Sequence, residues 1–580
     1  MGFGLLASLH HGMAADERPS TSEDAALRRL LAREWDYRLR QNPTFSSTLG
    51  DRRWNRAWED LSLQAFGARS NHYRWTLKKL DRIDPSKLSP ADKLNWGLFR
   101  REMALEIEEL GARWYLLPMN QREGHQTAHL LADDLRFQSI RDYLDWNARL
   151  RGVGRSVDQA IALMREGIRT RRVHARVIAE RIVPQIAKQI VDDPEESLFL
   201  KPYAVAKETG VNLDLSKARR EAVMAIREVV IPAYQRLEQF FQQEYLPACF
   251  EKEGIWQMPD GAELYAFLAR KFTTTRLTPD QIHDLGLSEV SRVREEMEKI
   301  RHRVQFRGSL REFFVHLRTD PQFAYRSPGQ LLAAYKAAAK RVDPLLNRVF
   351  RTLPRIPYGV EPIPDGIAPH TTTAYYRPPA ADGTRPGFYS VNLYRPETRF
   401  RHEIMALTLH EAVPGHHLQI ALSMEQGNLP HFRRYGGYTV FVEGWALYAE
   451  SLGDELGLYE DPYDKMGQLT YEMWRAVRLV VDTGIHAKRW SRKQAIDFFT
   501  EHAPKSELDI ANEIDRYIAW PGQALAYKIG ELKIKELRAL AQRELGVRFD
   551  LRAFHDAVLL AGALPLDLLE TRVLEWIRTQ

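Results

Sequence analysis

The sequence predicts a mostly α-helical protein, a large helical body with one small antiparallel β-sheet. Apolar residues recur at helical spacing over most of the chain. Only the region at about 355–395 has short β-branched and aromatic segments bounded by proline and glycine. With 580 residues, of which 44% are hydrophobic and 28% charged, the chain can bury a large core and is expected to be globular.

The helical pattern begins near the N-terminus and recurs along the chain. The segment from Ser22 to Pro43 predicts a first helix, with Ser22 as its N-cap and an end before the proline. Similar periodicity predicts helices within 66–110, 127–192, 215–247, 279–304 and 328–350. Because no repeat, low-complexity tract or long linker separates these ranges, we predict a single unit over residues 21–580.

The predicted sheet occupies residues 355–395. Its strands are expected in RIPYGVEPIP, HTTTAYYRPP and GFYSVNLY, and the segment AADGTRPG between the last two is typical of a hairpin turn. The sheet therefore comes directly before the helices at about 400–456, which carry the most distinctive motif of the chain.

Residues 1–20 resemble the end of a secretory signal, with a disordered N-terminus as the alternative. A short apolar run is followed by small residues and a polar stretch, although the positive charges that usually precede such a run are missing. No other segment approaches the ~20 apolar residues of a membrane span. We therefore predict a protein without a membrane span that is periplasmic or secreted, with a cytoplasmic location as the alternative.

Charge and cysteine content exclude two kinds of site. The 83 basic and 77 acidic residues give a net charge of +6, and the densest basic run, 164–183, has the apolar spacing of a solvated helix face. We therefore expect no nucleic-acid partner. Cys249 is the only cysteine, which excludes an intramolecular disulfide and a cysteine-based zinc site.

The segment TLHEAVPGHHLQI, residues 408–420, suggests a metal site. Helical zinc peptidases commonly carry two histidines four residues apart, with a glutamate directly after the first. Here His410 and Glu411 are followed by His416 and His417. In a regular helix His416 would point roughly 240° away from His410, and His417 would lie about 10.5 Å further along the axis. A regular helix therefore makes a good site with neither.

Pro414 and the glycine after it indicate that the helix is irregular at this point. Proline lacks the N–H that would bond the carbonyl of His410, and glycine adopts conformations closed to other residues. A bulge that absorbs two residues would make His410 and His416 zinc ligands and turn His417 aside. A bulge of three residues would make His417 the second ligand. In either case Glu411 is expected to take the proton of the zinc-bound water.

A catalytic zinc needs a third protein ligand and an open position for water. Glu443 lies in the first turn of the helix predicted within YTVFVEGWALYAESLGDELG, among apolar neighbours, so its carboxylate is expected to be buried and to need a partner. Glu450, two turns further on, is the alternative ligand and could instead orient a histidine. The earlier pair, His402 and Glu403, lacks a suitably spaced histidine and is interpreted as a polar pair on a helix surface.

Four separated motifs resemble the bacterial domain-of-unknown-function family 885. They are HEAVPGHHLQ, FVEGWALYAE, VDTGIHAKRWS and EIDRYIAWPGQALAYKIG, and the resemblance covers about residues 25–575. The family is grouped with zincin-like metallopeptidases, whose active-site helix follows a small sheet. The resemblance implies a zincin-like fold with one Zn²⁺ per chain held by His410, His416 and Glu443, and Glu411 as the general base. It implies no substrate, since the family is named for not having one.

The resemblance also implies groups that stabilise the oxyanion. Related helical peptidases place a histidine and a tyrosine there, which suggests His486 and the pair Arg516 and Tyr517. The alternative for the pair is a structural salt bridge and a core aromatic ring. GFYSVNLY is the expected edge strand for a peptide substrate, with Asn392 assisting.

The sequence as a whole predicts a zinc metallopeptidase that cuts oligopeptides. One alternative is a zinc amidase acting on a non-peptide or cell-wall amide, and another is an inactive binding or scaffold protein with the same fold. Glu411 argues against the inactive protein, because a structural metal needs no base. A structural zinc would also have four protein ligands, whereas only three good ones are found.

Overall fold

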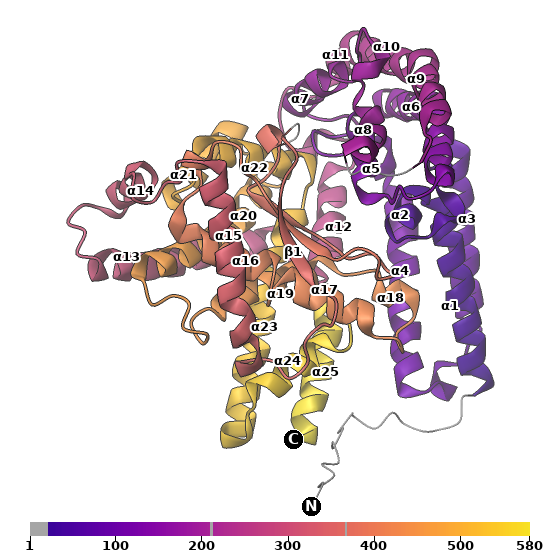
Figure 1. Ribbon diagram of the computed structural model, residues 1–580. Coiled ribbons are helices and arrows are strands. Elements are labelled where there is room, and N and C mark those ends of the chain that lie inside the picture. The colour runs from indigo at the N-terminus through magenta and orange to yellow at the C-terminus, as the bar shows by residue number, and fades with distance from the viewer. Residues whose placement is uncertain (1–20, 209–212, 366–367) are drawn as a thin grey trace, which may run out of the picture.

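The protein consists mainly of α-helices, which confirms the predicted fold class at this level (Figure 1). The computed structural model describes residues 21–208, 213–365 and 368–580. The signal-like segment 1–20 lies outside the described residues. Among the described helices, none combines the length and the apolar character that crossing a membrane requires.

The first helices lie together on one side of the molecule (Figure 1). Helix α1 begins at Ser22, but its N-cap is Thr21 and not Ser22, because the side chains of Thr21 and Asp24 each accept a hydrogen bond from the other's backbone N–H. The helices of this part are α1 (Ser22–Gln41), α2 (Pro43–Thr48), α3 (Leu63–Leu80), α4 (Pro90–Ala112) and α5 (Leu131–Asp134).

Residues between Met119 and Cys249 share a hydrophobic core that is distinct from the main core. The helices around it are α6 (Ile140–Arg169), α7 (Arg176–Ala187), α8 (Lys201–Glu208), α9 (Ser216–Ala225), α10 (Ile231–Phe240) and α11 (Leu246–Ala248). Two π-helical turns, Ile226–Val230 and Phe241–Tyr245, join the last three of these.

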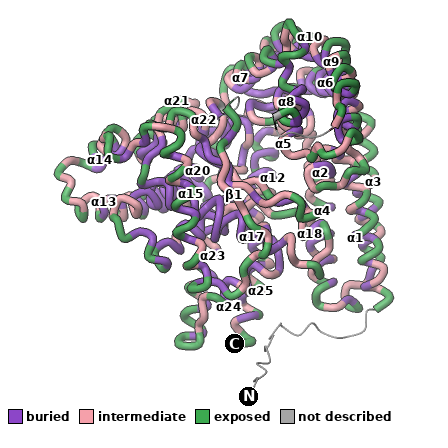
Figure 2. Tube along the Cα trace, in the orientation of Figure 1, coloured by how far each residue is buried: buried purple, intermediate pink, exposed green. Residues whose placement is uncertain are grey.

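The remaining helices surround the main core, at whose centre lies α20 (Pro462–His486). All residues of α20 from Met466 to His486 are buried, and buried residues (purple) fill the central part of Figure 2. The other helices are α12 (Gly261–Thr273), α13 (Pro279–Arg303), α14 (Leu310–Thr319), α15 (Pro328–Val342), α16 (Ile404–Glu411), α17 (His416–Glu425), α18 (His431–Arg434), α19 (Thr439–Ser451), α21 (Arg492–His502), α22 (Glu507–Ala519), α23 (Ala526–Leu545), α24 (Leu551–Leu559) and α25 (Leu566–Thr579).

The sheet has three strands in the order β1 (Tyr358–Pro362), β3 (Gly387–Val391) and β2 (Ala374–Arg377). β2 and β3 form the predicted antiparallel hairpin. The prediction of an all-antiparallel sheet is wrong, because β1 pairs with β3 in parallel. β3 is therefore the central strand, and β1 and β2 are the edges.

The sheet packs directly on the two helices of the histidine motif. β2 contacts α16 and β3 contacts α17. In Figure 1 the strands lie between the N-terminal helices and the helices of the main core. This arrangement places one edge of the sheet beside the motif.

Candidate metal centre

A sharp turn between α16 and α17 brings two histidines of the motif together. The prediction of a bulge inside one helix is wrong in form, because α16 ends at Glu411 and a separate helix begins at His416. Residues 412–415 form the turn between them. A Cβ atom on Gly415 would lie 1.9 Å from the carbonyl oxygen of His410, so only glycine fits at this position.

The turn is held in place by α19. The indole Nε1 of Trp445 donates a hydrogen bond to the carbonyl oxygen of Pro414, 2.8 Å away. α19 in turn packs closely on α23, where a Cβ on Gly444 would lie 2.5 Å from the Cα of Gly530. Glu443 directly precedes this contact. The close approach of α19 and α23 therefore helps to set the position of the Glu443 carboxylate.

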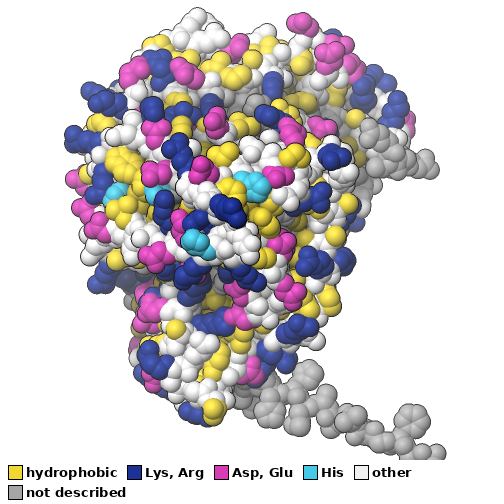
Figure 3. Space-filling model, turned by 90° about the vertical axis from the view of Figure 1, so that its left-hand side faces the viewer, with side chains coloured by type: hydrophobic (Ala, Val, Ile, Leu, Met, Phe, Trp, Pro, Cys, Tyr) yellow, Lys and Arg dark blue, Asp and Glu magenta, His cyan; other side chains and the backbone are white. Residues whose placement is uncertain are grey.

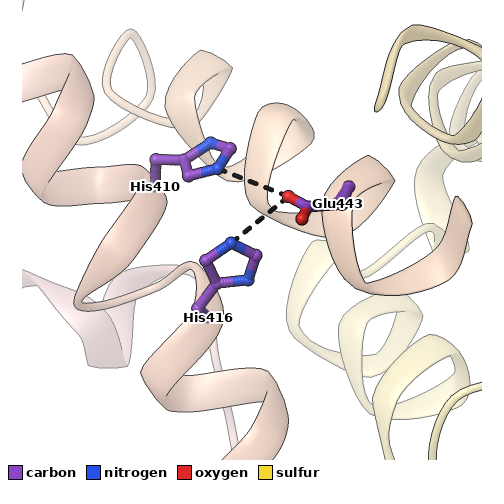
Figure 4. Close-up of side chains that lie close together, drawn as sticks. All are labelled: His410, His416 and Glu443. Carbon is purple, nitrogen blue, oxygen red and sulfur yellow. Dashed lines mark ion pairs between the residues drawn. The ribbon is translucent and has the colours of Figure 1, made fainter. Parts of the chain in front are cut away.

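The structure brings together the three residues predicted as metal ligands, His410, His416 and Glu443 (Figure 4). The Oε2 atom of Glu443 lies 3.7 Å from Nε2 of His410 and 3.3 Å from Nε2 of His416. All three ligand atoms lie within 4.8 Å of one another. The two distances from Glu443 are close to the ~3.4 Å expected between ligand atoms of a tetrahedral zinc with bonds of about 2.1 Å.

The state of the Glu443 carboxylate also fits a cation. Its Oε2 atom is buried and has no hydrogen-bond partner among the described residues. Burial alone would raise the pKa of Glu443, but His416 and His410 hold it well below its usual value. A buried, charged oxygen that faces two imidazoles without a hydrogen bond is a suitable ligand for a divalent metal.

Glu450 occupies the other side of His410. Its Oε1 atom lies 2.8 Å from Nδ1 of His410, and Nη2 of Arg475 lies 3.4 Å from the same oxygen. Burial would lower the pKa of His410, but the nearby carboxylates of Glu443 and Glu450 raise it. Glu450 thus matches the alternative role considered for it, because its contact with Nδ1 leaves Nε2 of His410 pointing towards Glu443.

We expect Glu450→Gln to lower the affinity for Zn²⁺ by about 10–100-fold, as is usual when a carboxylate partner of a metal-binding histidine is lost. The measurement is a competition titration with a chromophoric chelator. Unchanged affinity in a folded variant would show that Glu450 does not orient His410 for a metal.

His417 turns away from this group, as expected for the two-residue alternative. Its Nδ1 atom accepts a hydrogen bond from the hydroxyl of Tyr376 at 2.9 Å, and its Nε2 donates to the carbonyl oxygen of Ile356 at 3.1 Å. Burial lowers the pKa of His417 to about 4. Both ring nitrogens are therefore used to attach α17 to the sheet region.

A cavity of about 340 Å³ opens over the three ligands. Glu411 lies in its wall, together with the residues Ala374 to Tyr376 of β2. Four arginines also line it, namely Arg122, Arg475, Arg478 and Arg516. The cavity therefore combines a candidate metal site, a carboxylate next to it, a strand edge and several positive charges.

Of the residues expected to stabilise an oxyanion, only Arg516 lines the cavity. Nε2 of His486 donates to the carbonyl oxygen of Tyr517, and its Nδ1 accepts from the backbone N–H of Ile255. Tyr517 is absent from the cavity lining, and its hydroxyl is bonded to Glu513 and to Nε of Arg478, each at 2.8 Å. The structure thus corrects the expectation for His486 and Tyr517, whose polar atoms are engaged in the core.

Two further expectations are corrected by burial. Asn392 is buried and donates from its side chain to the carbonyl oxygens of Ala368 and Thr372, so it supports the loop before β2 and does not face the cavity. His402 and Glu403 are buried as well and do not form a surface pair. Glu403 accepts a hydrogen bond from Nζ of Lys505 at 2.7 Å.

Several cavity residues were not singled out from the sequence. Tyr527 stacks on His410 with ring centroids 6.4 Å apart, and it stands within the last of the four recognised motifs. Arg475 and Arg478 lie one turn apart on the central helix α20. Arg122 comes from the loop before α5 and stands outside the four motifs that carry the resemblance.

Comparisons with known proteins agree with the helical fold and name no activity. The family model "Bacterial protein of unknown function (DUF885)" matches residues 43–573. The chain is similar to the crystal structure of the "putative lipoprotein" from Colwellia psychrerythraea, with 29% identity, a TM-score of 0.91, and coverage of 97% of this chain and 100% of that one.

A second solved structure shares the fold. It is the "putative lipoprotein of unknown function" from Shewanella oneidensis, with 17% identity, a TM-score of 0.67, and coverage of 94% of this chain and 99% of that one. No curated protein matches the chain. Because the family model covers most of its length, the chain belongs to the DUF885 family of bacterial proteins of unknown function.

Proposed function

We propose that this protein is a zincin-like hydrolase that uses Zn²⁺ to cut peptide bonds in oligopeptides. The observation that carries the proposal is the convergence of His410, His416 and Glu443 in the wall of a cavity that also contains Glu411. Three protein ligands would leave a position open for water or substrate, as catalytic zinc sites require.

Glu411 is the proposed general base. A bound Zn²⁺ would supply Lewis-acid activation of the water and of the scissile carbonyl. Glu411 follows His410 in the chain, lines the cavity, and is absent from the group of three converging ligand atoms. In the proposed mechanism its carboxylate accepts a proton from the attacking water and delivers it to the leaving amine.

Tyr471 is the proposed donor to the oxyanion, in place of His486 and Tyr517. It lines the cavity, and its buried hydroxyl has no hydrogen-bond partner among the described residues. Burial raises the pKa of Tyr471 well above its usual value, so the phenol stays protonated and able to donate. A donor positioned in advance stabilises the charge that develops during attack on a carbonyl.

β2 is the proposed docking edge for the peptide backbone. The sequence suggested β3 for this role, but β3 pairs with strands on both sides and has no free edge. β2 is an edge strand, and its residues Ala374 to Tyr376 line the cavity. An extended peptide could add to this edge as a further strand.

On the face shown in Figure 3, acidic and basic side chains are interspersed, which favours a small substrate over a polyanion.

We also propose an extracytoplasmic location, either periplasmic or secreted. The support comes from the relative in Colwellia psychrerythraea, which is described as a "putative lipoprotein" and matches nearly the whole chain. Separation of cell compartments followed by immunodetection tests this placement, and a cytoplasmic signal would contradict it.

The proposed activity is tested by digestion of a mixed peptide library with product mass analysis. We expect cleavage by the zinc-loaded protein and none after treatment with a chelator. Absence of peptide cleavage in a sample that retains zinc would contradict a peptidase.

Chelation is expected to leave the far-ultraviolet circular dichroism essentially unchanged. The helices that carry the ligands belong to a large apolar core, so the metal is not needed to nucleate the fold. The same sample should lose its hydrolytic activity. A large loss of helical signal on chelation would show that the metal is structural.

A further inference from the structure

The lining of the cavity contains more arginines than carboxylates, four against the three of Glu411, Glu443 and Glu513. Four arginines line it, and two carboxylates pair with three of them. Glu450 pairs with Arg475, while Glu513 lies 3.0 Å from Arg478 and 3.4 Å from Arg516. The fourth arginine, Arg122, forms no close ion pair within the described residues, and the carboxylates of Glu513 and Glu123 act on it only at longer range.

Arg122 makes no hydrogen bond or ion pair through its guanidinium within the described part of the chain, and the guanidinium lies over the ring of Trp520. The guanidinium carbons of Arg122 and Arg516 lie 5.9 Å and 6.0 Å from the Trp520 ring centroid. Burial and the positive charge of Arg516 lower the pKa of Arg122. Two like charges thus share one aromatic ring, an arrangement that an anion would stabilise.

The backbone at Arg122 is fixed by its own loop. Oδ1 of Asn120 accepts hydrogen bonds from the backbone N–H groups of Arg122 and Glu123, at 2.8 Å and 3.1 Å. The loop therefore presents Arg122 in a defined position, although the side chain itself has no polar partner.

The neighbouring arginines also have unused donors. Nη1 of Arg478 and Nε of Arg516 are buried and have no hydrogen-bond partner in the described structure. Both side chains are more than nine-tenths buried, with 3% and 7% of their surface exposed. We call Arg122, Arg478 and Arg516 the arginine wall. Its free N–H groups can bind a planar anion through paired hydrogen bonds.

We infer that the arginine wall binds the free α-carboxylate of a peptide substrate, so that cleavage takes place within one or two residues of the C-terminus. This inference rests on the proposed peptidase function for the bond that is cut. A carboxylate fits because a guanidinium offers it two parallel N–H donors. The backbone of the same peptide would lie along the edge of β2, which lines the same cavity.

The distance between the arginine wall and the candidate metal ligands limits the number of substrate residues that fit between them. The guanidinium carbon of Arg516 lies 5.8 Å from the ring centroid of Tyr527, which lies 6.4 Å from that of His410. Arg516 and His410 are therefore at most about 12 Å apart. A charge-assisted hydrogen bond takes ~2.7–2.9 Å and an extended residue ~3.3–3.6 Å, so at most about two residues fit within this distance.

The first test is a binding measurement that does not depend on turnover. Calorimetry on the metal-free protein would compare acetyl-Ala-Ala-Ala carrying a free carboxylate with the same peptide as its C-terminal amide. We expect the carboxylate to bind at least about tenfold more tightly, the effect of one charge-assisted hydrogen bond. Equal affinities would overturn the inference.

Arg122→Gln is the variant to compare in the same measurement, because the side chain of Arg122 has no hydrogen bond that the substitution would remove. We expect the preference for the carboxylate to fall at least about tenfold, with an unchanged thermal midpoint. Arg151→Gln removes the same charge from an exposed position on α6 and should keep the preference. A preference that survives Arg122→Gln would overturn the role of Arg122. Inorganic phosphate that competes more strongly than the carboxylate peptide would overturn the assignment to a carboxylate.

Hydrolysis by the zinc-loaded protein separates this inference from the proposed function. We expect cleavage of the free peptide, with products shortened by one or two C-terminal residues, and much slower cleavage of the amide. Equal cleavage of both peptides would overturn the inference and leave the peptidase intact. Cleavage of neither, together with selective binding of the carboxylate, would overturn the peptidase and support the carboxylate site.

Discussion

Replacement of Glu411 by glutamine is expected to lower kcat for peptide hydrolysis by about 10²–10⁴-fold, the usual contribution of a general base. Glutamine has nearly the same shape as glutamate but cannot accept the proton of the attacking water. Since Glu411 is not one of the three converging ligands, zinc content should stay at one per chain. Rate and metal content should be measured on the same preparation.

Glu295→Gln is a suitable control for Glu411→Gln. Glu295 is exposed on α13 and is absent from the cavity wall, so its loss should leave kcat unchanged. A Glu411→Gln protein with bound zinc and a near-normal rate would remove Glu411 from the mechanism.

His416→Ala is expected to abolish stoichiometric zinc binding, whereas His417→Ala should retain it. Loss of a direct ligand should cost more than the ~10–100-fold that loss of a ligand's partner costs. His417 instead bonds Tyr376 and Ile356, so its removal should lower the free energy of unfolding by about 1–3 kcal/mol. Atomic absorption after dialysis and thermal unfolding measure the two effects. Retained zinc in His416→Ala with empty His417→Ala would reassign the ligand.

The helical fold could be predicted because its signal is local. Apolar spacing identified the helical ranges, and the hairpin of β2 and β3 followed from a turn motif between adjacent segments. The parallel pairing of β1 with β3 could not be predicted in this way, since it depends on contacts between segments that are not consecutive. The break between α16 and α17 was predicted as a bulge, because proline and glycine indicate irregularity without specifying its shape.

The candidate ligands could be predicted because His410 and His416 are close in sequence and Glu443 stands among apolar residues of a helix. His486 and Tyr517 were placed at the site by resemblance alone, and the structure shows their polar atoms bonded elsewhere. Buried Glu403 pairs with Lys505, about one hundred residues away in the chain, and buried His402 packs on Phe323, so local spacing could not reveal their surroundings.

The arginine wall was beyond the reach of sequence patterns. Arg122 belongs to a loop near the N-terminal helices, Arg478 to α20 and Arg516 to α22, and only the tertiary fold brings them to one cavity. No fixed spacing connects such residues. The excess of arginines over carboxylates in the cavity can be recognised only when the ion-pair partners of each arginine are known.

The central claim is that His410, His416 and Glu443 hold Zn²⁺, and anomalous diffraction at the zinc absorption edge from crystals grown with Zn²⁺ tests it most directly. The expected result is one strong peak about 2.0–2.2 Å from Nε2 of His410, Nε2 of His416 and a carboxylate oxygen of Glu443. A crystal that contains zinc but has no anomalous peak at these three residues, or has its peak at His417, would contradict the account.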